Sequence, residues 1–259
     1  MSKREDQHPI DSLLHSDLIP SIWCPGCGIG IVVNTFLQTV KKLNIDPDEI
    51  CVVSSGLGCI GKIPEYLRFK RLNTADRNVL HSAATLKMEN PDFKIVVFLN
   101  DDDFIASGVD DLLEACKKGI EFLVIYINSF IYHVFMEHKE LHQTPFKRNP
   151  SSNDSESPFN IPHLAKTCGA SFVARWTPLH CRRLTFSIKE AFLKQGFSLI
   201  EVISPCLMYY ASAGKLGKIL DRMGIFYKNS VIKNEEPTEN LDIRANKKIV
   251  VGKFVDRQK

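Results

Sequence analysis

Short apolar runs alternate with segments of helical spacing along most of the chain, and this alternation limits the folds available to it. The runs that we expect to form strands are Ile50–Ser54, Lys94–Leu99, Glu121–Ile127, Ser171–Arg175, Phe197–Ser204 and Lys247–Val255. The segments with apolar residues at helical spacing are Ile29–Leu43, Arg77–Met88, Ala106–Lys118, Ile161–Cys168 and Leu184–Gln195. Strands separated by helices of about 10–15 residues are typical of a parallel sheet. We therefore expect an α/β fold with a mostly parallel sheet flanked by helices.

The candidate strands are apolar almost throughout, as expected where helices cover both faces of a sheet. The chain has 259 residues, 44% of them hydrophobic, which is enough for a full core. Ligands of such sheets bind beyond the carboxyl ends of the strands. The segments at those ends are SGLGCIG, NDDDF, NSFIYH and SPCLMYY, and we expect them to lie together.

Composition and charge exclude several classes of partner. The net charge is +3, and no run of Lys and Arg stands out, so we expect no nucleic acid to bind. No stretch of roughly 18 apolar residues is present, so we expect no membrane span. The polar start MSKREDQHPIDSLLHS lacks the apolar region of a signal peptide, which predicts a cytoplasmic protein.

Four of the eight cysteines stand in segments where thiols can converge. Cys24 and Cys27 form a CxxC in a Pro-Gly turn, Cys59 lies in a glycine turn, and Cys206 follows a strand. Four thiolates suit either zinc or an iron–sulfur cluster, and the spacing does not choose between them. A redox CxxC, or a set of reduced buried thiols, is the alternative. Cys51 and Cys168 read as ordinary buried thiols, whereas Cys116 and Cys181 carry no motif.

Three adjacent carboxylates, Asp101, Asp102 and Asp103, follow the strand ending at Leu99. One interpretation is a solvated acidic turn, or an acidic cap for the helix at Ala106. A second is a Mg²⁺ site for a diphosphate, and a third is a salt-bridged contact with a partner subunit.

Several motifs together carry a likeness to one enzyme family. They are WCPGCG, VVSSGLGC, NPDFKIVV, GFSLIEVISPC near residue 200, and IVVGKFVD near the end. Over roughly residues 20–255 the chain resembles the β subunits of 2-oxoacid:ferredoxin oxidoreductases. The segments IVVGKFVD and ARWTPLH are more similar to the 2-oxoglutarate type than to the pyruvate type.

The resemblance implies a thiamine-diphosphate-binding fold of the pyrophosphate-domain type. It also implies oxidative decarboxylation of a 2-oxoacid to an acyl-CoA, with electron transfer through a [4Fe–4S] cluster to ferredoxin. The implied partners are an α subunit, γ or δ subunits of the same complex, ferredoxin, the 2-oxoacid and coenzyme A. We expect a polar segment at residues 1–19, the cofactor domain at 20–228, and a linker and strand at 229–259.

The resemblance further implies roles for individual residues. The implied cluster ligands are Cys24, Cys27, Cys59 and Cys206. The implied Mg²⁺ ligands are Asp101, Ser129 and the carbonyl of Ile131. The residues implied to contact thiamine diphosphate are Leu57, Gly58, Cys59, Ile60, Asp102, Asp103, His133 and Val134.

The cofactor motif departs from the family pattern at several positions. Asp102 stands where the family has glycine, and at ~4 Å in an effective dielectric of 20 its charge would repel a phosphate by about 4 kcal/mol. Ser129 stands where the family has asparagine, and His133, Phe135 and Met136 replace small residues. These changes predict an alternative: a degenerate electron-transfer or structural subunit that binds thiamine diphosphate weakly or not at all.

The segment after the third strand contains His133, His138 and His142. A histidine there can act as a proton shuttle, because its ordinary pKa lies near neutrality. The alternative is that all three are polar loop residues. The long polar loop at residues 143–157 is a candidate lid, or else exposed surface.

Overall fold

The sheet has eight strands in the order β2-β1-β3-β4-β6-β5-β8-β7. The computed structural model describes residues 8–74, 78–104, 109–130, 159–206, 219–244 and 247–257, with backbone alone at residues 102, 109 and 219–222. In sheet order the strands are β2 Lys70–Asn73, β1 Ile50–Ser54, β3 Lys94–Asn100, β4 Leu123–Asn128, β6 Ser198–Ile203, β5 Phe172–Trp176, β8 Ile249–Asp256 and β7 Ser230–Ile232. All neighbouring strands run parallel except β5 and β8, which are antiparallel. The expected α/β fold with a mostly parallel sheet is confirmed.

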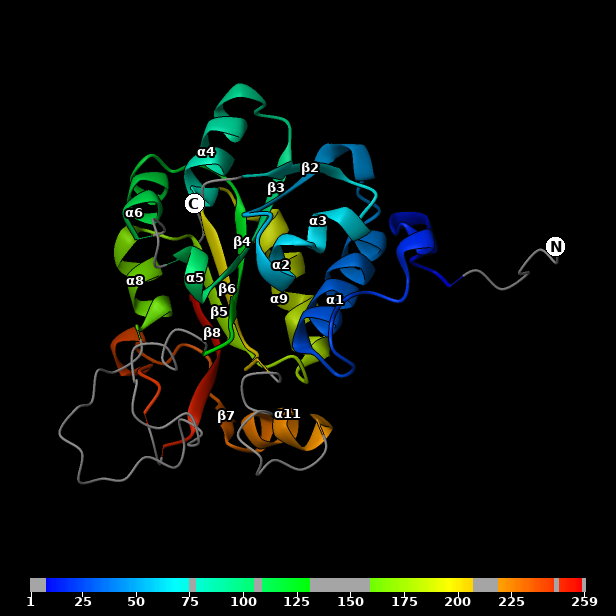
Figure 1. Ribbon diagram of the computed structural model, residues 1–259. Coiled ribbons are helices and arrows are strands. Elements are labelled where there is room, and N and C mark those ends of the chain that lie inside the picture. Colours follow the sequence, from blue (N-terminus) through cyan, green and yellow to red (C-terminus); the bar gives the residue numbers. More distant parts are fainter. Residues whose placement is uncertain are drawn as a thin grey trace.

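Helices cover both faces of the sheet (Figure 1). The longer ones are α1 Gly28–Leu43, α4 Val79–Glu89, α6 Val109–Lys117, α8 Ile161–Cys168, α9 Cys181–Leu193 and α11 Ile219–Lys228. The short ones are α2 Gly58–Gly61, α3 Ile63–Tyr66 and α5 Asp101–Asp103. Residues of α1 and α9 share one apolar core with one face of the sheet, and residues of α4, α6 and α8 share a second core with the other face. Burial on both faces explains why β1, β4, β5 and β6 are apolar almost throughout.

The predicted elements and the observed ones agree within a few residues along the described chain. β1 and α8 have the predicted bounds, and α9 begins three residues earlier than predicted, at Cys181. Two strands were not predicted, β2 and β7, because β2 is mostly exposed, β7 is partly exposed, and both are too short to show an apolar run. The last strand, β8, pairs with β5 and so extends the main sheet into the C-terminal region.

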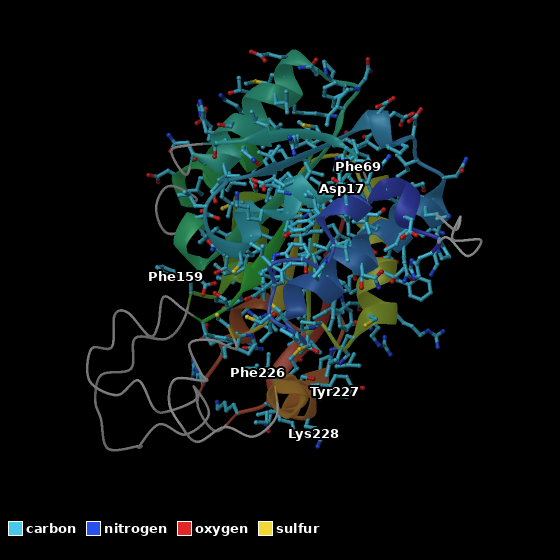
Figure 2. The ribbon with its side chains drawn as sticks, turned by 45° about the vertical axis from the view of Figure 1, so that its right-hand side comes forward. Asp17, Phe69, Phe159, Phe226, Tyr227 and Lys228 are labelled. Atoms are coloured by element: carbon cyan, nitrogen blue, oxygen red, sulfur yellow. The ribbon has the colours of Figure 1, made fainter. Side chains whose placement is uncertain are left out.

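The carboxyl ends of the central strands point toward α11 (Figure 1). Phe226 of α11 stacks on Phe130, just beyond β4, with ring centroids 5.7 Å apart. The next residue, Tyr227, lies 4.6 Å from the ring of His180, which precedes α9. Figure 2 labels Phe226, Tyr227 and Lys228 on this helix. The helix therefore packs against the loops that follow β4 and β5.

None of the helices in the described ranges has the length and apolarity that crossing a bilayer requires.

Candidate functional site

The CxxC turn leads directly into α1. Cys27 is the N-cap residue of α1, and its backbone N–H donates to the carbonyl of Cys24 at 2.8 Å. Gly26 has φ of 77°, a left-handed conformation that glycine adopts without a Cβ clash. The indole Nε1 of Trp23 donates to the carbonyl of Cys59 at 2.9 Å, which joins this turn to the glycine turn after β1.

The glycine turn after β1 folds back closely on itself. Gly56 and Gly58 have φ of 70° and 61°. A Cβ on Gly61 would lie 2.3 Å from the backbone carbonyl carbon of Gly56, so only glycine fits there. The turn places Leu57 as the N-cap of α2, leaves Cys59 exposed and buries Ile60.

The start of α1 also contacts the end of β6 closely. A Cβ on Gly28 would lie 2.0 Å from Ser204 Oγ and 2.7 Å from Cγ of Pro178. The backbone of α1 therefore touches the segment that leads to Cys206, and only glycine permits this approach. The contact draws Cys27 and Cys206, far apart in sequence, to the same edge of the sheet.

The four predicted cluster cysteines influence one another electrostatically. The pKa of the Cys27 thiol is raised to about 11, mainly by burial. A backbone hydrogen bond at Ile29 lowers this pKa, whereas the charges of Cys206, Cys24 and Cys59 raise it. Burial likewise raises the pKa of Cys59, with further contributions from Cys206 and Cys24. The structure thus brings the four thiols into one neighbourhood, and their role as ligands stays a prediction. In the described part of the chain, no three His, Cys, Asp or Glu side chains are arranged to hold a single metal ion.

Asp101 follows β3 and is buried, with 3% of its surface exposed. Its Oδ1 accepts from Tyr126 OH at 3.0 Å and from the backbone N–H of Ser129 at 3.1 Å. Its Oδ2 accepts from the hydroxyl of Ser129 at 3.0 Å. Burial is the main cause that raises the pKa of Tyr126 well above its usual range, and the charges of Asp101 and Glu201 raise it further. The phenol therefore stays protonated and donates the hydrogen bond to Asp101.

The acidic cluster is not the solvated turn that one interpretation predicted. Asp103 is also only 3% exposed, and the three residues form the short helix α5. Asn100 caps this helix, because its Oδ1 accepts from the backbone N–H of Asp103 at 2.9 Å. The predicted capping of a helix at Ala106 lies outside the described residues, as does the side chain of Asp102.

Several predicted site residues also fall outside the described ranges. They are Ile131, His133, Val134, His138, His142 and the loop at residues 143–157. The roles proposed for them stay predictions.

A backbone hydrogen bond joins a predicted Mg²⁺ ligand, Ser129, to a predicted cluster ligand, Cys206. The N–H of Cys206 donates to the carbonyl of Ser129 at 3.0 Å. The N–H of Ser204 donates to the carbonyl of Asn128 at 2.9 Å. The ends of β4 and β6 are therefore joined where Ser129 and Cys206 stand.

Four buried polar residues near these strand ends were not identified from the sequence. They are Tyr126, Asn128, Arg175 and Glu201. Glu201 binds both Arg175, at 2.6 Å, and Asn128, at 2.8 Å. A charged residue inside each of the apolar runs FVARW and SLIEVI was the available signal, because a buried charge needs a partner.

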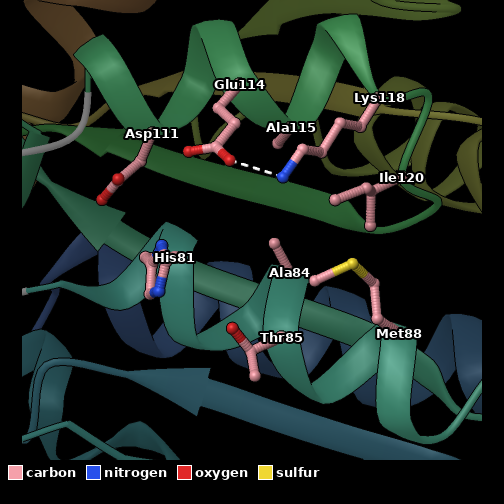
Figure 3. A pocket seen from close by; sticks show the side chains of 9 residues that line it. All are labelled: His81, Ala84, Thr85, Met88, Asp111, Glu114, Ala115, Lys118 and Ile120. Carbon is pink, nitrogen blue, oxygen red and sulfur yellow. Dashed lines mark hydrogen bonds and ion pairs between the residues drawn. The ribbon is translucent and has the colours of Figure 1, made fainter.

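A small cavity between α4 and α6 lies apart from these loops (Figure 3). Its volume is about 30 Å³, and its polar lining includes His81, Asp111 and the Glu114–Lys118 ion pair, at 2.5 Å. Because a buried water needs at least about 10–15 Å³, the cavity holds a few waters at most. It is too small for a cofactor.

Comparison with known proteins is consistent with this arrangement. Residues 78–202 match the family model described as the C-terminal TPP-binding domain of thiamine pyrophosphate enzymes. The KorB subunit of 2-oxoglutarate synthase from Methanocaldococcus jannaschii is 34% identical, over 97% of this chain and 93% of that protein. The KorB subunit from Methanothermobacter thermautotrophicus is also 34% identical, over 99% of this chain and 89% of that protein.

A solved structure shares the fold. The 2-oxoglutarate:ferredoxin oxidoreductase from Magnetococcus marinus superposes with a TM-score of 0.75, over 99% of this chain and 87% of that chain, at 19% identity. The β subunit of a 2-oxoacid:ferredoxin oxidoreductase from Sulfolobus is 29% identical over 72% of this chain and 62% of that protein. The chain therefore belongs to the β subunits of the 2-oxoacid:ferredoxin oxidoreductases, a family that includes the KorB subunits of 2-oxoglutarate synthases.

Proposed function

We propose that this β subunit takes part in the oxidative decarboxylation of 2-oxoglutarate to an acyl-CoA, with electrons leaving through a [4Fe–4S] cluster to ferredoxin. The substrate is proposed from the similarity to the KorB subunits, which are named for 2-oxoglutarate synthase. Bound thiamine diphosphate supplies the group that takes up the electron pair released when the 2-oxoacid loses CO₂. The complex further requires an α subunit and coenzyme A.

The contact between Asp101 and Ser129 is the observation that carries this proposal. Two neighbouring ligands of an octahedral Mg²⁺ ion, each at 2.0–2.1 Å, stand about 3 Å apart. Asp101 Oδ2 and Ser129 Oγ are 3.0 Å apart, so the pair fits two adjacent ligand positions. A serine hydroxyl can donate its proton to the carboxylate while its lone pairs face the metal. The replacement of asparagine by Ser129 is therefore compatible with a Mg²⁺ site.

The four thiols support a cluster more than a single zinc ion. A tetrahedral zinc with Zn–S bonds of 2.3 Å needs its sulfurs about 3.8 Å apart. A four-iron cluster is larger and holds its thiolates further apart. The thiols of this chain act on one another's pKa, yet none of the described groups of such residues suits one ion. We propose Cys24, Cys27, Cys59 and Cys206 as the cluster ligands.

Formation of a cluster at this site would have to deprotonate buried thiols. The pKa of Cys27 is about 11, so its free thiol is protonated near neutral pH. Binding of a cluster would release that proton, because the bound ligand is the thiolate. The N–H of Ile29, whose hydrogen bond lowers the pKa of Cys27, would stabilise the bound thiolate.

Anaerobic purification with the co-purifying subunits tests the proposal. We expect iron, sulfide and thiamine diphosphate in the complex, a broad visible absorption, and reduction of a viologen dye that needs both 2-oxoglutarate and coenzyme A. Iron and sulfide without thiamine diphosphate would support the degenerate electron-transfer subunit instead. A colourless protein that contains zinc would overturn the cluster.

A further inference from the structure

An ion pair lies buried in the middle of the sheet, where no predicted ligand stands. Arg175 Nε on β5 is 2.6 Å from Glu201 Oε2 on β6, and their side chains are 1% and 0% exposed. The two residues are direct partners in the strand register. Buried ion pairs contribute little to stability, because desolvation offsets their attraction, and some are retained to fix one conformation. A pair retained in spite of this cost is expected to hold a neighbouring group in place.

The second oxygen of Glu201 holds the last residue of β4. Glu201 Oε1 accepts from Asn128 Nδ2 at 2.8 Å. Asn128 Oδ1 in turn accepts from the backbone N–H of Phe130 at 3.3 Å. Because its Nδ2 faces an acceptor and its Oδ1 faces a donor, the amide of Asn128 has one satisfied orientation.

The turn that Asn128 caps has an unfavourable backbone. Phe130 has φ of 56°, a left-handed conformation that costs energy for a residue with a Cβ. The hydrogen bond from Asn128 and the stacking on Phe226 both support it. This turn aims the N–H and the hydroxyl of Ser129 at Asp101, at 3.1 and 3.0 Å.

We infer that Glu201, fixed by Arg175, is a positioning residue that holds Asn128 and so sets the Ser129–Asp101 geometry. The inference rests on the proposed function in one respect, namely that Ser129 and Asp101 bind Mg²⁺. Arg175 adds a further anchor, because its Nη1 donates to the carbonyl of Leu241 at 2.7 Å. Arg175, which binds Glu201, is thereby also tied to the segment between β7 and β8.

Two double variants separate this role from simple stability. Arg175→Met with Glu201→Gln removes both charges and keeps an oxygen that accepts from Asn128. Arg175→Met with Glu201→Leu removes the charges and the acceptor, and hydrophobic replacement of a buried ion pair is tolerated in other folds. We expect the Leu variant to bind Mg²⁺, titrated with thiamine diphosphate in the purified complex, at least tenfold more weakly than the Gln variant.

A second readout does not depend on the cofactor. Hydrogen exchange at the Phe130 amide reports directly on the cap from Asn128, and we expect it to be at least tenfold faster in the Leu variant. Equal Mg²⁺ affinity and equal exchange in the two variants would overturn the inference. Should the wild type fail to bind Mg²⁺ and thiamine diphosphate, the proposed function falls, and the exchange rates still decide whether Glu201 holds the turn.

Single substitutions on β4 cover the case in which the Leu variant does not fold. Asn128→Ala removes the cap, whereas Val124→Ala truncates a buried side chain on the same strand and face. Val124→Ala is expected to lose stability with unchanged exchange at Phe130 and unchanged Mg²⁺ affinity. Asn128→Ala is expected to accelerate exchange and weaken Mg²⁺ binding at least tenfold. Equal effects of the two substitutions would contradict the inference.

Discussion

At the scale of single residues, Asp101 of the acidic cluster is tolerated in a buried place because hydrogen-bond donors surround its carboxylate. Asp101 accepts from Tyr126 and from two groups of Ser129. Hydrogen bonds of this kind stabilise the charged form of a carboxylate. The same contact sets the spacing of the two proposed Mg²⁺ ligands, Asp101 and Ser129, which relates the local hydrogen bonding to the proposed chemistry.

The hydroxyl of Ser129 is expected to matter more for metal binding than for stability. Ser129→Ala removes a proposed ligand and a donor to Asp101, so we expect Mg²⁺ to bind about tenfold more weakly or worse. Titration calorimetry with thiamine diphosphate present measures this. Ser198→Ala is the matched control, because the hydroxyl of Ser198 is buried and has no hydrogen-bond partner in the described structure. If the two variants bind alike, Ser129 is not a ligand.

At the scale of elements, α1 and β6 meet at a contact that only glycine allows. The start of α1 carries Cys27, and the chain beyond β6 carries Cys206. Their approach is set by Gly28, which faces Ser204 and Pro178. The proposed cluster site therefore depends on the packing of a helix against a strand end.

Substitutions of two glycines in α1 test this contact. In Gly28→Ala the new Cβ meets Ser204 Oγ at 2.0 Å, so we expect a loss of about 1–3 kcal/mol of stability and reduced iron content. In Gly30→Ala the nearest atom, in Trp23, is 3.8 Å away, so we expect a gain of about 0.5–1 kcal/mol from the helix and full iron content. For both variants, thermal unfolding measures the change in stability and iron analysis measures the iron content. Full iron content in Gly28→Ala would show that the contact does not set the cluster site.

At the scale of the whole molecule, the sheet separates two apolar cores, and three thiols, those of Cys51, Cys116 and Cys168, are buried in the core that contains α4, α6 and α8. Burial raises the pKa of Cys51 to about 11 and that of Cys116 to about 12. In the unfolded chain a thiol has a pKa of about 8.5. Above that pH the unfolded chain binds fewer protons than the folded chain, so folding stability falls as the pH rises.

Alkaline unfolding is therefore expected to depend on these core thiols. From about pH 8.5 toward pH 11, each thiol should lower stability by at most about 1.4 kcal/mol per pH unit. Urea unfolding at a series of pH values gives the slope. The double variant Cys51→Ala with Cys116→Ala is expected to be less stable at pH 7 and to show a shallower slope. An unchanged slope would mean that neither thiol contributes.

The sequence determined the order of the elements, because burial on both faces leaves an apolar run for every central strand. It also marked the four cysteines, through a CxxC turn, a glycine turn and a strand end, and the acidic cluster, through the strand that precedes it. It did not indicate β2 or β7, whose exposed and partly exposed residues have no distinctive pattern. Nor did it assign partners to Arg175 and Glu201, although it placed each inside an apolar run.

Only the tertiary structure decided which groups surround the candidate site. The joining of β4 to β6 placed Ser129 beside Cys206, and the neighbouring β3 placed Asp101 within reach of Ser129. These contacts join residues separated by tens of positions, and no local pattern encodes them. The sequence therefore specified which chemical groups stand at the strand ends, whereas strand order and register specified which of those groups meet.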